Sequence, residues 1–217
     1  MKIVIGFIVL VCAIAFGGIL YHQHRQKHLT PAAIASHIEI DGTVLPTPRV
    51  IHPFQLRDTQ NKPFSNANLK GHWTLIFFGF TNCGYVCPTT FSELAKTYKT
   101  LQAQLPASLL PQVVMVSVDP DRDTINRLKD YVHAFNPAFI GLRGKIDATK
   151  NLADQMSAVF AKVNMPNNNY TVTHSAEIML LDPNGKLRAF LSYPHTSDRM
   201  THDYESVVQA YTKVEYP

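Results

Sequence analysis

Two shortages narrow the range of functions for this chain: it has little charge and few cysteines. Charged residues make up 17% of the 217 residues, and the formal net charge is only +4. No basic run interleaved with aromatic residues occurs, which excludes nucleic acid as a partner. Of the three cysteines, Cys12 lies in an apolar N-terminal stretch, so only Cys83 and Cys87 remain elsewhere. Two cysteines argue against a structural zinc site, because such sites take four ligands.

The N-terminus, by contrast, has a long run without charge. Residues 3–20 carry no charged side chain, and at about 1.5 Å of rise per residue a helix of this length just spans a bilayer's hydrocarbon core. A cleaved signal peptide is the alternative, since Ala13 and Ala15 form a small-residue cleavage site. The apolar run continues to Leu20, however, so we expect an uncleaved transmembrane anchor over residues 1–21.

The charges beside this segment do not fix its orientation, because Lys2 lies on one side and Arg25 and Lys27 lie on the other. The remaining cysteine pair favours an exported domain, since exposed thiol pairs undergo redox chemistry in secreted compartments. No Arg- and Ser-rich transit peptide precedes the segment. The expected location is therefore a bacterial inner membrane, crossed once, with the soluble domain on the periplasmic side.

The rest of the chain divides into a linker and one folded domain. Residues 22–48 are rich in histidine, glutamine, basic residues and proline, which predicts a polar linker. Its histidines, His22, His24 and His28, could collect metal ions, but the linker is the better explanation. Residues 49–217 are expected to form the folded domain.

This domain alternates buried strands with amphipathic helices. We expect strands at 50–56, 73–80, 111–118, 139–140, 176–181 and 187–191, and helices at 88–105, 125–135, 146–160 and 197–211. A nearly continuous apolar strand such as 73–80 is typical of the centre of an α/β sheet. Units of β-α-β followed by a hairpin and a helix predict a thioredoxin-like α/β sandwich with a central mixed sheet, preceded by a single N-terminal transmembrane helix.

Cys83 and Cys87 lie where the apolar strand ends and a helix led by Pro88 begins. Unpartnered amide groups and the positive end of the helix dipole favour thiolates at such a junction. Positions four apart share a helix face, so both sulfur atoms can approach one point. Two inert core cysteines would not account for this position. The pair then has two uses: cycling between dithiol and disulfide, or binding a soft metal ion.

A third ligand would favour the metal ion, and His174 is the candidate among the ten histidines. It stands at the predicted start of a strand, where thioredoxin-like folds place a loop that faces the active cysteines. Two sulfur atoms and one imidazole suit copper, because this set of donors is soft enough for Cu(I) and includes the nitrogen that Cu(II) accepts.

Three parts of the sequence, in this order, resemble the Sco/SenC family. They are GFTNCGYVCP (79–88), VSVDPDRDT (116–124), and VTHSA (172–176) followed by LDPNG (181–185). Members of this family are membrane-tethered copper proteins of thioredoxin fold that help to assemble the binuclear copper site of cytochrome c oxidase. The resemblance covers nearly the whole predicted domain.

The resemblance implies that Cys83, Cys87 and His174 ligate one copper ion, as Cu(I) or Cu(II). It also implies that Asp119 lies near the metal, where it would support the site or recognise a partner. An aspartate before Pro120 suits a plain turn equally well. The implied partners are the copper-bearing subunit of cytochrome c oxidase or another copper chaperone.

Two functions therefore stay open. The first is a copper metallochaperone, which needs no bond-making catalysis and would not be an enzyme. The second is a thiol–disulfide oxidoreductase that reduces the cysteines of the partner's copper site, with Cys83 and Cys87 as its redox pair. Peroxidases of the peroxiredoxin type share the fold, but their Pro-x-x-x-Thr/Ser-x-x-Cys pattern is absent: Ile76 and Phe80 hold the proline and hydroxyl positions before Cys83.

Overall fold

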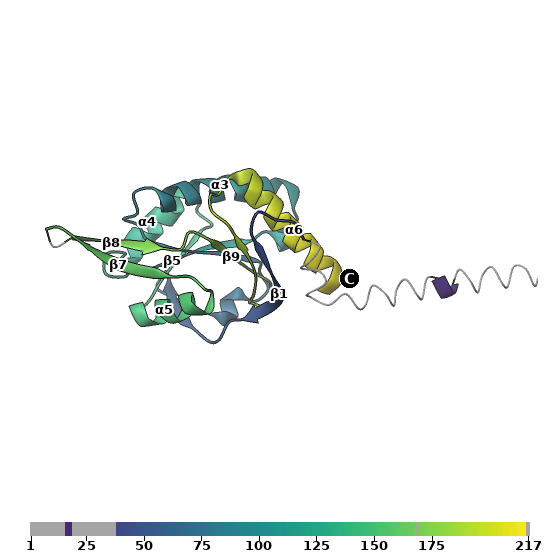
Figure 1. Cartoon of the computed structure of the whole chain (residues 1–217), viewed down its shortest axis with the longest axis horizontal. Coiled ribbons are helices and arrows are strands. Elements are labelled where there is room, and N and C mark those ends of the chain that lie inside the picture. The colour runs from purple at the N-terminus through teal and green to yellow at the C-terminus, as the bar shows by residue number, and fades with distance from the viewer. Residues whose placement is uncertain (1–15, 19–37, 168, 216–217) are drawn as a thin grey trace, which may run out of the picture.

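The computed structural model describes residues 16–18, 38–167 and 169–215 (Figure 1). The predicted anchor at 1–21 and the predicted linker at 22–48 lie largely outside these residues. In the described ranges, no helix combines the length and the apolar composition that crossing a membrane requires.

The centre of the domain is an eight-stranded mixed sheet with the strand order β1-β10-β9-β4-β5-β6-β2-β3. Its middle strands run parallel: β4 (Thr74–Gly79), β5 (Gln112–Ser117) and β6 (Ile140–Arg143). The flanking strands pair antiparallel: β9 (Ile178–Leu181), β10 (Lys186–Leu191) and β1 (Thr43–Val50) on one side, β2 (Gln55–Asp58) and β3 (Pro63–Ser65) on the other. The predicted thioredoxin-like α/β fold with a mixed central sheet is confirmed.

Helices cover both faces of this sheet. On one side α3 (Val86–Gln104) packs along α6 (Ser197–Glu215) and contacts α4 (Ile125–Phe135), and α5 (Ile146–Gln155) lies on the other side (Figure 1). Two short 3-10 turns, η1 (Asn66–Leu69) and η2 (Ala107–Leu109), lie in the connections that lead to β4 and β5. Because it is covered from both sides, β4 is buried at every position, as its continuous apolar sequence predicts.

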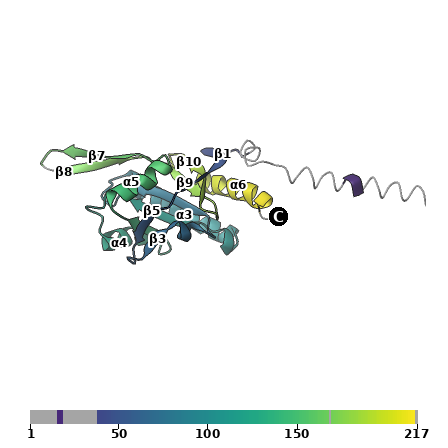
Figure 2. The ribbon, with the colours of Figure 1, turned by 90° about the horizontal axis from the view of Figure 1, so that it is seen from below.

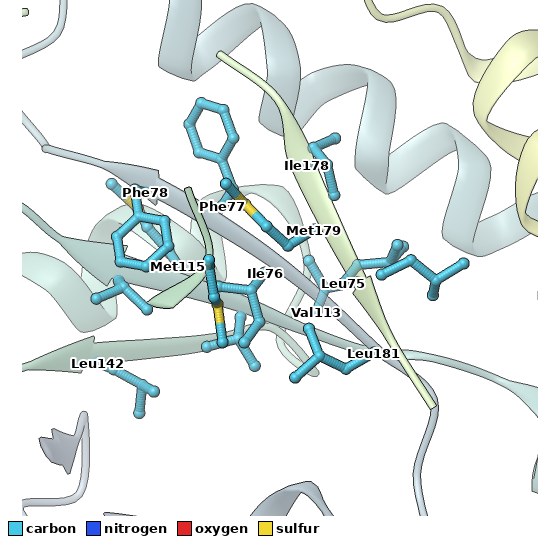
Figure 3. Packing of buried hydrophobic residues seen from close by; sticks show 14 of the residues in the cluster. Leu75, Ile76, Phe77, Phe78, Val113, Met115, Leu142, Ile178, Met179 and Leu181 are labelled. Atoms are coloured by element: carbon cyan, nitrogen blue, oxygen red, sulfur yellow. The ribbon is translucent and has the colours of Figure 1, made fainter. Parts of the chain in front are cut away.

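The core that fixes β4 comes from its neighbours in the sheet. Phe77 on β4, Met115 on β5 and Met179 on β9 are each almost fully buried in this cluster (Figure 3). Full burial of one such side chain stabilises the fold by about 1.5–3 kcal/mol. The end of β4, where the cysteine loop begins, is therefore held firmly in place.

A two-stranded antiparallel hairpin, β7 (Phe160–Met165) and β8 (Asn169–His174), connects α5 to β9. Two perpendicular views show it projecting beyond the sheet, and we call it the arm (Figures 1 and 2). The base of the arm carries His174, which pairs with Phe160 in the hairpin register. One of the three predicted ligands thus lies where the arm joins the body of the domain.

The start of the folded domain differs from the prediction. Instead of one strand at 50–56, β1 ends at Val50 and β2 begins at Gln55. Strand β1 begins at Thr43, within the predicted linker, and pairs with β10. Proline has no backbone N–H to donate to a neighbouring strand. The two prolines of β1 are tolerated because β1 lies at the edge of the sheet and has a neighbouring strand on one side only.

The predicted C-terminal end of the helix at 146–160 was also wrong. Helix α5 ends at Gln155, and Phe160 is the first residue of β7. Ser157 adopts a positive φ of 56°, and the Ala158 amide N–H donates to the Ala153 carbonyl over 2.9 Å. This left-handed residue after the last turn ends the helix and turns the chain towards the arm.

Candidate metal centre

The loop between β4 and α3 brings the two cysteines to one point. Cys83 lies in this loop, and Cys87 is a buried residue in the first turn of α3. The Cys87 amide N–H donates to Cys83 Sγ over 3.3 Å, so sulfur accepts a hydrogen bond at a helix start that has no side-chain cap. A Cβ atom at Gly79 would lie 3.1 Å from Cys87 Sγ. The glycine that ends β4 thus leaves the space that this sulfur needs.

His174 reaches the cysteines from the arm. It is the last residue of β8, and not the start of the next strand as predicted, because the ladder with β7 continues to it. Its ring stands edge-on to Phe77 and Phe80, with centroids 5.5 and 5.8 Å away. The ring Nδ1–H donates to the Ser175 carbonyl over 2.7 Å. This bond leaves the Nε2 lone pair free to face the sulfur atoms.

The ligand atoms of Cys83, Cys87 and His174 all lie within 4.8 Å of one another. Cys87 Sγ is 3.4 Å from His174 Nε2. Metal–sulfur and metal–imidazole bonds of about 2.3 and 2.0 Å place three ligand atoms roughly 3.5–4 Å apart around a shared ion. The observed separations therefore fit a metal ion with only small movements of the side chains.

The two thiols differ in acidity. A hydrogen bond with the Cys87 thiol lowers the pKa of Cys83 to about 3, despite its partial burial, with smaller help from nearby backbone groups. The same hydrogen bond, together with burial, raises the pKa of the Cys87 thiol far above its usual value. Cys83 is only partly buried. Before a metal ion binds, Cys83 is therefore the thiolate and the more nucleophilic of the two.

Alkylation of Cys83 by iodoacetamide is expected to proceed at nearly the same rate at pH 5 and at pH 8. A pKa of about 3 keeps the thiolate populated across this range, whereas the thiolate of an ordinary cysteine becomes about a thousandfold scarcer. Mass spectrometry of peptides from the reduced, metal-free chain measures the rate at each cysteine. A Cys83 rate that falls in step with the pH would contradict the assignment.

Asp119 does not join the group of ligand atoms but supports the arm. This buried carboxylate accepts a hydrogen bond from the Tyr170 hydroxyl over 2.8 Å and forms an ion pair with Arg122. Arg122 in turn donates to the Tyr170 carbonyl over 2.9 Å, and its guanidinium lies 3.8 Å from the centre of the tyrosine ring. Tyr170 belongs to β8, the strand that ends in His174. Asp119 and Arg122 therefore hold the strand that carries the imidazole.

Asp123 has a role that the sequence reasoning missed. Its fully buried carboxylate accepts hydrogen bonds from the Ser117 hydroxyl and the Thr81 hydroxyl, each over 2.6 Å, and from the Thr81 amide over 3.2 Å. These bonds tie the cysteine loop to the end of β5. The N-cap of α4 is the neighbouring Thr124, whose hydroxyl accepts a hydrogen bond from the Arg127 amide over 3.2 Å.

The sequence of this chain is similar to that of a known protein family. The model of the SCO1/SenC family matches residues 43–209. An SCO2-like protein of Rickettsia prowazekii is 38% identical over 136 residues, which cover 62% of this chain and 65% of that protein. The chain therefore spans slightly less than two thirds of this relative.

Solved structures with copper bound are also similar. The crystal structure of Arabidopsis thaliana ScoI with copper bound has 30% identity and a TM-score of 0.68, and the similarity covers 76% of this chain and 99% of that one. Yeast Sco1 with copper bound has 29% identity and a TM-score of 0.69, with coverage of 77% and 93%.

Proposed function

This chain belongs to the SCO1/SenC family, and we propose that it is a copper metallochaperone. It binds one copper ion through Cys83, Cys87 and His174 and delivers the ion during assembly of the binuclear copper site of cytochrome c oxidase. The observation that carries this proposal is the meeting of two sulfur atoms and one imidazole nitrogen within 4.8 Å. The copper in the similar Arabidopsis and yeast structures supports copper as the ion.

The protonation states of the two thiols suit metal uptake. Cys83 is already a thiolate at neutral pH, and Cys87 still holds its proton. Since only thiolates ligate copper, binding releases the Cys87 proton, and affinity rises with pH. His174 needs no proton change at Nε2, because its bond to the Ser175 carbonyl selects the tautomer that ligates there. Two thiolates and one imidazole then accept either Cu(I) or Cu(II).

Delivery requires that another protein can approach the ion. Cys83 is only partly buried, and its neighbour Tyr85 is 69% exposed, so this side of the site is open. Cys87, by contrast, is fully buried against the core. A partner's cysteine or histidine would displace Cys83 first and take the ion by ligand exchange. The proposed recipients are the copper-bearing oxidase subunit or another copper chaperone, and no bond-making catalysis is needed.

Copper stoichiometry tests this proposal. The reduced full chain in detergent is titrated anaerobically with Cu(I) against a chromophoric chelator. We expect one tightly bound equivalent in the wild type and in Cys12→Ser, which removes the one cysteine outside the site. Cys83→Ser and Cys87→Ser should each lose this equivalent. Tight stoichiometric binding by either of the last two variants would rule out the proposed ligand set.

A thiol–disulfide oxidoreductase is the second candidate, favoured by the unequal acidity of the two cysteines. The Cys83 thiolate attacks a partner's disulfide and forms a mixed disulfide, releasing one partner thiolate. Cys87, after losing its proton, attacks Cys83 and releases the second thiolate. The partner gains two electrons, and Cys83 and Cys87 are left oxidised as a disulfide. A chain that reduces such a disulfide but binds no copper would favour this function over the first.

We further propose that residues 1–21 anchor the protein in a bacterial inner membrane. A linker from residue 22 to the start of β1 at Thr43 then joins this anchor to a periplasmic domain. The uncharged run at 3–20 supports the anchor. Protease added to intact spheroplasts should digest the domain, and alkaline carbonate should leave the chain in the membrane fraction. Release by carbonate would refute the anchor.

A further inference from the structure

A cavity of about 660 Å³ lies beside the neighbouring strands β2 and β6. Its walls come from these two strands, from the start of α5 and from the turn after β5. None of the three proposed copper ligands lines it. Leu56, Ile125 and Ile146 give the cavity an apolar part, and the charged side chains described next give it a polar part.

Two neighbouring arginines line the cavity. Arg57 on β2 and Arg143 on β6 are direct partners in the antiparallel register, so their side chains leave the same face of the sheet. Like charges in this position repel one another. Each is held by a carbonyl: Arg57 donates to the Asn61 carbonyl and Arg143 to the Pro120 carbonyl, both over 2.8 Å. These bonds orient the two guanidinium groups without neutralising their charge.

Neither arginine forms an ion pair with an acidic side chain in the described part of the chain. Nε of Arg143 is buried without a hydrogen-bond partner. Lys145, two residues beyond Arg143, adds a third positive charge to the lining. The one acidic residue that lines the cavity, Asp121, is 77% exposed and lies 3.6 Å from Lys162 on the arm. The cavity thus has an excess of positive charge.

We propose that this cavity binds a phosphate group. Guanidinium groups form planar pairs of hydrogen bonds with phosphate oxygens, and two of them with a lysine match a dianion better than the single charge of a carboxylate. A bound phosphate would also remove the repulsion between Arg57 and Arg143. The ligand is either free phosphate or a phosphate monoester such as a lipid headgroup, whose carbon chain would lie against the apolar part of the wall.

Calorimetric titration of the reduced full chain with inorganic phosphate tests this site, with chloride holding the ionic strength constant. We expect saturable binding in the wild type, and about tenfold or greater weakening in Arg57→Gln and Arg143→Gln, because each removes a charge-assisted bond. Lys145→Gln changes an exposed side chain and should weaken binding without disturbing the fold. Lys129→Gln, an exposed residue of α4 outside the cavity, is the charge-matched control and should bind as the wild type does.

Glycerol 1-phosphate distinguishes the two sources of ligand. Tighter binding than inorganic phosphate would identify a monoester or headgroup, and equal or weaker binding would identify free phosphate. The proposal is overturned if the wild type shows no saturable binding of either compound. It is equally overturned if Lys145→Gln and the arginine variants bind as well as Lys129→Gln. This measurement does not depend on copper binding. A negative result would therefore refute the phosphate site without refuting the proposed metal centre.

Discussion

Replacing His174 with alanine is expected to weaken copper binding by about a hundredfold or more. The substitution removes the one nitrogen among three ligand atoms that lie within 4.8 Å, and loss even of a residue that only orients a ligand costs 10–100-fold in metal affinity. Competition with a chromophoric chelator measures the change. His72→Ala alters an exposed histidine outside the site and is the matched control.

The same variant separates the two candidate functions. Cys83 and Cys87 remain in place in His174→Ala, so oxidation should still join them as a disulfide, visible as loss of free thiols. A metallochaperone therefore loses its activity in this variant, whereas a reductase keeps it. Wild-type copper affinity in His174→Ala would remove the imidazole from the site and with it the proposed mechanism.

Replacing Asp123 with alanine is expected to lower the free energy of unfolding by about 2–4 kcal/mol. The buried carboxylate accepts hydrogen bonds from Ser117 and Thr81. Its loss leaves the buried Ser117 hydroxyl and the half-buried Thr81 groups without this acceptor. Urea unfolding of the reduced chain, followed by the fluorescence of Trp73, measures the effect. Trp73 is the single tryptophan and is 2% exposed, so it reports on the core.

Asp121→Ala is the control for this experiment. Its side chain is 77% exposed and forms only a distant surface ion pair, so we expect a change within about 0.5 kcal/mol. Because Asp123 also ties down the loop that carries Cys83, its replacement should increase the mobility of that loop and weaken copper binding. Equal stability of the two variants would show that the buried hydrogen bonds of Asp123 do not support the loop.

Local sequence signals predicted the parts of the fold that local chemistry determines. The apolar run of β4, the helix α4 over 125–135, and the hairpin of β9 and β10 were all expected from the sequence. The cysteine loop was predicted as well, since strand, turn and helix adjoin there. These features depend on residues that are close together along the chain.

The errors arose where a local pattern conflicted with tertiary structure. Leu152, Met156 and Phe160 follow a helical period, but Ser157 adopts the left-handed conformation more typical of glycine or asparagine, so the sequence contained no stop signal. The prolines at 46 and 48 led to the prediction of a linker, yet they lie in an edge strand, where proline is tolerated. The edge position depends on pairing with β10, which no local pattern encodes.

The residue types of the site were predictable from the sequence, but the hydrogen bonds that support the site were not. The motifs and their resemblance to a family selected Cys83, Cys87 and His174, and the structure brings their ligand atoms together. The bond between Asp123 and Thr81 joins residues 42 positions apart. The bond from Tyr170 to Asp119 spans 51 positions. Contacts of this kind depend on the folded sheet, so a single sequence gives no direct sign of them.

X-ray absorption spectroscopy of the copper-loaded, reduced chain tests the central claim most directly. The account predicts one copper ion per chain with two sulfur neighbours at about 2.3 Å and one imidazole nitrogen at about 2.0 Å, and loss of the imidazole signal in His174→Ala. A copper environment with sulfur neighbours alone, or one that is the same in the wild type and in His174→Ala, would contradict it.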